Sequence, residues 1–120
     1  MSRILVVDDD RYMAEAAAIM LVCESEHEVV TAFSGYSAMA ELRNKDFALV
    51  ITDLKMPGMD GFALLESMRQ SGMQIPAIMI TSFHTPEEEK RARKLNVYAY
   101  LTKPFDNDEL KALVHKALEH

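Results

Sequence analysis

The stretch Phe47-Ala48-Leu49-Val50-Ile51-Thr52-Asp53 carries the pattern that decides the fold. Its first five residues are apolar, and an aspartate follows two positions after them. Strands that are buried on both faces have continuous apolar sequences of this kind, and such strands form parallel sheets covered by helices. The runs Ile4-Leu5-Val6-Val7 and Ala77-Ile78-Met79-Ile80 have the same character. The sequence therefore predicts three buried strands of one parallel sheet.

Two weaker strand candidates and the signals that bound the helices complete the pattern. Residues 28–32 and 97–101 contain the β-branched and aromatic residues that strands favour. Thr85-Pro86 is typical of a helix start, and Asn96 is typical of the cap that ends such a helix. Asp106 begins a capping-box pattern before the last predicted helix.

Five predicted strands and five predicted helices alternate along the chain, with no internal repeat or linker between them. This order is the signature of an α/β fold with a parallel sheet. Because crossover connections are right-handed, we expect helices on both faces of the sheet. Ligands of such sheets bind beyond the carboxyl ends of the strands, so candidate chemistry is sought there.

Composition limits the classes of protein that fit. The chain has 120 residues, about half of them apolar, so one domain can bury a core without disulfides or a structural metal. Its only cysteine, Cys23, favours a reducing setting, and we expect it to be buried in the first helix. The four apolar residues before Asp8 are too few for a signal peptide or a membrane span. We therefore expect a soluble cytoplasmic protein that does not engage a membrane.

The net charge of −6 argues against direct binding to nucleic acid, whose phosphates would repel the chain. We expect residues 1–118 to form a single domain. Leu118-Glu119-His120 resembles the opening of a vector-encoded histidine tag, in which case residues 119–120 are not native. An ordinary polar helix end fits the same residues equally well.

Polar side chains follow four of the predicted strands. Asp8-Asp9-Asp10 follows the first strand, Asp53 ends the third, Thr81 ends the fourth, and Lys103-Pro104 follows the fifth. Because the carboxyl ends of parallel strands meet at one edge of the sheet, we expect these groups to lie together. Asp10 is the exception, since an aspartate in that position more often caps the following helix.

The charges of this cluster indicate a metal ion. Two like charges about 4 Å apart repel by roughly 4 kcal/mol at an effective dielectric constant near 20. Asp8, Asp9 and Asp53 would therefore destabilise the fold unless they were protonated or neutralised by a cation. Magnesium takes oxygen ligands and also binds phosphate, whereas the absence of nearby Cys or His disfavours zinc. Lys103 adds positive charge and favours an ionised Asp53.

Four motifs occur in order along the chain: Ile4-Leu5-Val6-Val7-Asp8-Asp9-Asp10, Thr52-Asp53-Leu54-Lys55-Met56-Pro57-Gly58-Met59-Asp60-Gly61, Ile80-Thr81-Ser82 and Tyr100-Leu101-Thr102-Lys103-Pro104-Phe105. Together they resemble the receiver domain of two-component response regulators of the chemotaxis-regulator type. The resemblance implies a flavodoxin-like (βα)5 fold, a doubly wound five-stranded parallel sheet in the order 2-1-3-4-5. It also implies a phosphorylation-dependent signalling switch that catalyses only its own phosphorylation and dephosphorylation.

The resemblance further implies which residues carry the chemistry. Asp53 would be the phosphoacceptor, which attacks the phosphohistidine of a sensor histidine kinase or a phosphotransfer protein. Asp8 and Asp9 would bind Mg²⁺ together with Asp53 and the backbone carbonyl of Lys55.

Other motif residues would respond to the phosphoryl group. Thr81 and Lys103 would bind it, and Tyr100 would be the aromatic switch, although a strand residue that only packs fits Tyr100 as well. The Lys103–Pro104 bond would be cis. The fourth helix, fifth strand and fifth helix would form the output surface, which would serve a homodimer or an output domain of a longer protein.

Two other functions stay open. A receiver-like domain could act as an interaction partner without phosphorylation. A magnesium-dependent phosphatase on a related sheet usually has its nucleophile and its acid two residues apart after the first strand, as Asp8 and Asp10 are. The next residues, Arg11-Tyr12, do not continue such a motif.

Overall fold

The computed structural model describes residues 2–24, 27–82 and 85–119. Its strands are β1 (Arg3–Val7), β2 (Glu28–Ala32), β3 (Leu49–Asp53), β4 (Ala77–Thr81) and β5 (Ala99–Thr102). Its helices are α1 (Arg11–Glu24), α2 (Gly35–Asn44), α3 (Gly61–Gln70), α4 (Pro86–Lys94) and α5 (Asn107–Glu119).

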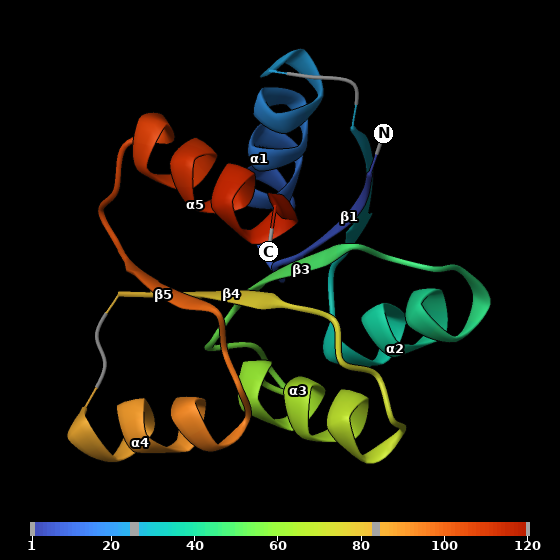
Figure 1. Ribbon diagram of the computed structural model, residues 1–120, viewed down its shortest axis with the longest axis vertical. Helices are drawn as coiled ribbons and strands as arrows, with labels where there is room; N and C mark the ends of the chain where they lie inside the picture. The colour runs from blue at the N-terminus through green and yellow to red at the C-terminus, as the bar shows by residue number, and fades with distance from the viewer. Residues whose placement is uncertain (1, 25–26, 83–84, 120) are drawn as a thin grey trace.

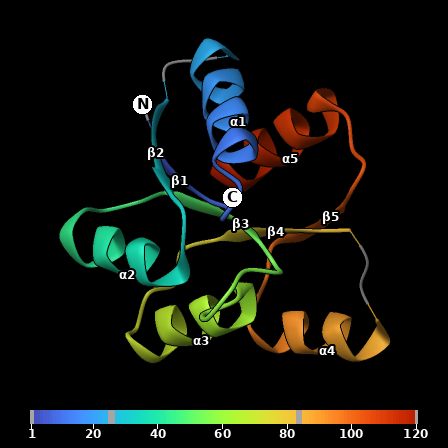
Figure 2. The ribbon, with the colours of Figure 1, turned by 180° about the vertical axis from the view of Figure 1, so that it is seen from behind.

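The five strands form one parallel sheet in the order β2-β1-β3-β4-β5, which confirms the predicted fold class and strand order. Helices α1 and α5 cover one face of this sheet, and α2, α3 and α4 cover the other (Figures 1 and 2). The edge strand β5 lies between the α4 layer and the α5 layer (Figure 1). Among the described residues no helix combines the length and the apolar character that crossing a membrane requires.

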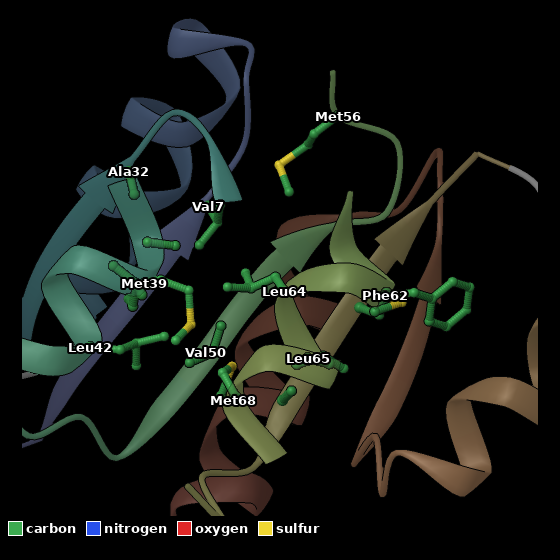
Figure 3. Close-up of a cluster of buried hydrophobic side chains, with 14 of the residues drawn as sticks. Val7, Ala32, Met39, Leu42, Val50, Met56, Phe62, Leu64, Leu65 and Met68 are labelled. Carbon is green, nitrogen blue, oxygen red and sulfur yellow. The ribbon is translucent and has the colours of Figure 1, made fainter. Parts of the chain in front are cut away.

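Two hydrophobic clusters fill the spaces between the sheet and its two helix layers. Val50 belongs to the cluster shown in Figure 3, which packs the sheet against α2 and α3 through residues such as Met39 and Leu64. Its neighbour Ile51 belongs to the second cluster, on the side of α1 and α5. Successive strand side chains point to opposite faces, so both residues are buried and the strand sequence is apolar throughout.

The predicted starts of β3 and β5 are each two residues too early. Ladder pairing of β3 with β1 begins at Leu49, while Phe47 lies before the strand, buried in the loop that follows α2. At β5, the backbone N–H of Val97 donates to the carbonyl of Ala92 in α4, so Val97 belongs to the helix end. Propensity alone does not reveal this competing hydrogen bond.

The predicted helix boundaries at α4 and α5 are confirmed. Thr85 and Glu88 form a capping box at the start of α4, and Asp106 and Glu109 exchange the same two hydrogen bonds at the start of α5. Asn96 has a φ of 58°, the left-handed conformation that ends α4.

The expectation that Cys23 is buried is wrong, because its side chain is exposed on α1. Helix α1 also exposes Tyr12, Ile19 and Val22. Nearly all of its residues are apolar, so helical periodicity does not distinguish the face that packs on the sheet.

Candidate functional site

The carboxyl edge of the sheet brings side chains from separate strands together. Asp53 is the last residue of β3 and pairs in register with Ile80 of β4. Beyond β5, the backbone N–H of Lys103 donates to the carbonyl of Thr81 at 2.7 Å. These ladder contacts fix the positions of Asp53 and Lys103, since both belong to or directly continue paired strands.

Three carboxylates lie close together at this edge. Asp8, Asp9 and Asp53 each have an oxygen within 4.8 Å of the others. Asp8 is buried, Asp53 is half-buried and Asp9 is exposed, so the group opens to solvent on one side. Hard oxygen donors at this spacing fit a divalent cation such as Mg²⁺, which keeps part of its water shell.

Burial raises the pKa of two of these carboxyl groups. The pKa of Asp8 rises to about 6, chiefly through desolvation, against the lowering effect of a hydrogen bond from the backbone N–H of Asp10. Desolvation also raises the pKa of Asp53, opposed by the charge of Lys103. A carboxylate cluster that resists ionisation without a cation gains most from binding one.

Lys103 supplies the positive charge of the site. Its Nζ lies 3.2 Å from Oδ1 of Asp53, and both residues are half-buried. The Lys103–Pro104 peptide bond is cis. The lysine is therefore in direct contact with the carboxylate at the end of β3.

The structure places the other predicted site residues, Thr81, Tyr100 and Lys55, on β4, on β5 and in the loop after β3. Thr81 ends β4 and is buried, next in sequence to the register partner of Asp53. The hydroxyl of half-buried Tyr100 donates to the carbonyl of Glu88 in α4 at 3.5 Å, and desolvation raises the Tyr100 pKa to about 12. Lys55 lies in the loop after β3, and its side chain forms an ion pair with Glu88.

Asp10 caps the start of α1 and does not belong to the carboxylate cluster, as its position in the sequence predicted. Its Oδ1 accepts hydrogen bonds from the backbone N–H groups of Tyr12 and Met13, at 3.0 and 3.4 Å. Engaged in this cap, Asp10 does not supply the second acid that a phosphatase reading of Asp8 and Asp10 requires.

Glu88 is the residue near the site that sequence reasoning missed. It caps α4, pairs with Lys55 and accepts the Tyr100 hydrogen bond through its carbonyl. The pattern Thr85-x-x-Glu88 was a readable signal for the cap. The contact with Lys55, 33 residues away, had no local signal.

Comparison with known proteins decides the family. The sequence model of the response regulator receiver domain matches residues 4–115. The chain belongs to this receiver domain family. The receiver domain is 36% identical to the transcriptional regulatory protein ZraR of Salmonella typhimurium over 118 residues, which are 98% of this chain and 26% of ZraR. It thus spans about a quarter of the length of the curated relatives that it matches.

Solved structures agree with this assignment. The receiver domain superposes on the chemotaxis protein CheY4 of Vibrio cholerae with a TM-score of 0.92 at 28% identity, covering 98% of this chain and 99% of that one. It also superposes on NtrX of Brucella abortus with a TM-score of 0.88 at 33% identity, covering 98% of this chain and 27% of NtrX. The receiver fold is thus found in relatives of this length and in longer proteins.

Proposed function

We propose that this receiver domain is a signalling switch in which Asp53 accepts a phosphoryl group in the presence of Mg²⁺. The observation that carries the proposal is the position of the Asp53 carboxylate, 3.2 Å from the ammonium of Lys103 and within bridging distance of Asp8 and Asp9. One nucleophilic oxygen is thereby surrounded by the charges that phosphoryl transfer uses.

In this phosphoryl transfer the protein forms one covalent bond, through Asp53, and otherwise positions charged groups around the phosphorus. An Asp53 oxygen forms a bond to phosphorus as the N–P bond of a phosphohistidine breaks, and the departing imidazole keeps the electron pair. Lys103 stays close to Asp53 and pairs with an oxygen of the transferred group, and the Thr81 hydroxyl donates to another. No general base is needed, because the nucleophile is a carboxylate.

The acidic residues would hold the cation. Asp8, Asp9 and Asp53, together with the backbone carbonyl of Lys55, are the proposed Mg²⁺ ligands. Bound there, Mg²⁺ neutralises the negative charge that accumulates on the phosphoryl oxygens. The raised pKa of Asp8 fits this role, since a cation compensates the charge that burial disfavours.

The conformational change that follows phosphorylation would be transmitted from the site through β5 to the helices beside it. Tyr100 lies in β5 and contacts Glu88 of α4, so a shift at Thr81 and Lys103 reaches α4 and α5 through neighbouring backbone. We propose this α4-β5-α5 surface for a homodimer or for an output domain, which the names of the transcriptional regulators among the relatives favour. The donor would be a cytoplasmic sensor histidine kinase or a phosphotransfer protein.

Incubation with acetyl phosphate and Mg²⁺, followed by intact mass spectrometry, tests the proposal. We expect an increment of one phosphoryl group, which EDTA or Asp53→Asn abolishes. Asp46→Asn, at an exposed aspartate on the opposite edge of the sheet, is the matched control and should label normally. A wild-type domain that binds Mg²⁺ but gains no mass would instead support the alternative, an interaction domain that works without phosphorylation.

A further inference from the structure

A cavity of about 410 Å³ lies between α1 and α5, on the sheet face opposite the cluster of Figure 3. Its floor consists of apolar side chains from the three central strands, Val6, Ile51 and Ile80. Ala17 of α1 and Leu110 of α5 lie on its sides. The volume falls within the range of about 300–1,000 Å³ that small-molecule sites occupy.

The sequence of α1 explains why this space is open. Positions 16, 17 and 18 are alanines, and Ala16 and Ala17 both line the cavity. An alanine side chain ends at Cβ, so this part of α1 does not reach across to Leu110 as a leucine or isoleucine would. The apolar floor is thereby left beneath a gap that protein atoms do not fill.

One end of the cavity has charged walls. Asp8, Asp53 and Lys103 line it where it meets the carboxyl edge of the sheet, and Asp9 lies within 4.8 Å of the two aspartates. Two carboxylates and one ammonium group line this end, and the carboxylate of Asp9 lies beside them, so the uncompensated charge is negative. An occupant that reaches this end is favoured if it is positively charged there.

We propose that the cavity binds a small molecule with an apolar body and one cationic end, such as an alkylammonium or alkylamidinium compound. The apolar body lies on Val6, Ile51 and Ile80, and the cationic group donates hydrogen bonds to Asp8 and Asp53. Both parts are needed, because the floor offers only dispersion contacts and burial, while the carboxylates supply orientation.

Such a ligand would compete with Mg²⁺, because the two cations share Asp8 and Asp53. This regulatory consequence rests on the proposed function, in which those carboxylates hold Mg²⁺. Binding of the ligand to the cavity does not depend on the proposed function. A bound ammonium group would hold the receiver domain in a form that does not accept a phosphoryl group.

Titration of the whole chain with butylamine and hexylamine, followed through the methyl NMR signals of Ile51 and Ile80, tests the inference. We expect saturable shifts of both signals and an affinity that rises about fourfold for each added methylene group. Hexanol and hexanoate should bind at least about tenfold more weakly than hexylamine, since they lack the cation. Mg²⁺ should raise the apparent Kd of hexylamine.

Cavity-filling variants make the test specific. Ala17→Leu should weaken hexylamine binding at least about tenfold, whereas Ala40→Leu on the exposed face of α2 should not change it. Ala16→Leu at the rim provides a second variant if Ala17→Leu does not fold. Each variant is checked for a folded NMR spectrum before titration.

Four results would overturn the inference. They are no saturable shift at Ile51 and Ile80, an affinity independent of chain length, equal binding of hexylamine and hexanoate, and undiminished binding in the folded cavity-filling variants. The titration contains no phosphodonor, so its outcome does not depend on the proposed function. If the wild-type domain bound hexylamine but were not labelled by acetyl phosphate, only the proposed function would be contradicted.

Discussion

The ammonium nitrogen of Lys55 lies 3.3 Å from Oε2 of Glu88, and this ion pair joins the loop after β3 to the first turn of α4. The other carboxylate oxygen of Glu88 accepts a hydrogen bond from the backbone N–H of Thr85. One side chain thus holds both the helix start and the loop that follows Asp53.

The two roles of Glu88 can be separated by substitution. Glu88→Gln keeps a capping-box residue and removes the ion pair, so we expect a loss of about 0.5 kcal/mol or less in the free energy of unfolding. Glu88→Ala also removes the hydrogen bond that the Glu88 carboxylate accepts from the Thr85 N–H, which is one half of the capping box, and should cost about 1 kcal/mol more. Urea unfolding measures both values. Equal losses for the two variants would show that the Glu88 half of the capping box contributes nothing.

Arg69 should be the main polar anchor between α3 and α4. Its guanidinium donates to the carbonyls of Leu95, Met73 and Ile75, each at 2.9 Å. Helix α4 has a single buried residue, Ala92, so apolar packing supplies little of its attachment. We expect Arg69→Ala to lower the free energy of unfolding by about 2 kcal/mol, because the carbonyls lose their donors.

The conservative variant tests the geometry of this anchor. Arg69→Lys keeps the charge, but an ammonium group does not match the forked donors of a guanidinium. We expect it to retain less than half of the Arg69 contribution in urea unfolding. Arg43→Ala on the exposed surface of α2 is the control and should change little. If Arg69→Lys were as stable as the parent, the positive charge alone would account for the contribution of Arg69, without the geometry of the guanidinium.

Asp8 should make stability depend on pH when divalent cations are removed. Its folded pKa of about 6 lies above the ordinary value of 3.8, so the folded state binds more protons between these values. Stability therefore falls as pH rises from about 4 to about 6, by roughly 2–3 kcal/mol in total from this group. In EDTA, Asp8→Asn should be more stable than the parent at pH 7.5, and this advantage should disappear near pH 4. A variant less stable than the parent at pH 7.5 would contradict the desolvation argument.

Magnesium should stabilise the domain through the same carboxylates. At a concentration 100 times its Kd, a ligand that binds only the folded state adds about 2.7 kcal/mol, which appears as a higher melting temperature. Asp9→Asn should weaken this response, since it replaces a charged carboxylate of the cluster by a neutral amide, which is a poorer ligand for Mg²⁺. Thermal unfolding with and without Mg²⁺ measures the effect. An unchanged response would show that the charge of Asp9 does not contribute to Mg²⁺ binding.

The strand order was implied by the resemblance that the four motifs carry. The meeting of Asp8, Asp53 and Lys103 could be predicted from the residues themselves, because the carboxyl ends of parallel strands share one edge of the sheet. The contacts of Glu88 and Arg69 could not, since they join segments distant in sequence through surface geometry.

The packing of helix α1 could not be predicted from the sequence either. Its apolar residues gave no indication that Cys23 faces outward, or that the alanines would leave a cavity against α5. Periodicity identifies a buried face only when the opposite face is polar.

Locating the acyl phosphate in the chain tests most directly whether Asp53 is the phosphoacceptor. Borohydride reduces an aspartyl phosphate to homoserine with release of phosphate, and tandem mass spectrometry then locates the homoserine in the chain. After labelling with acetyl phosphate and Mg²⁺, we expect homoserine at position 53, with Asp8 and Asp9 unchanged. Homoserine at position 8 or 9, or a labelled protein in which Asp53 survives reduction, would contradict this assignment.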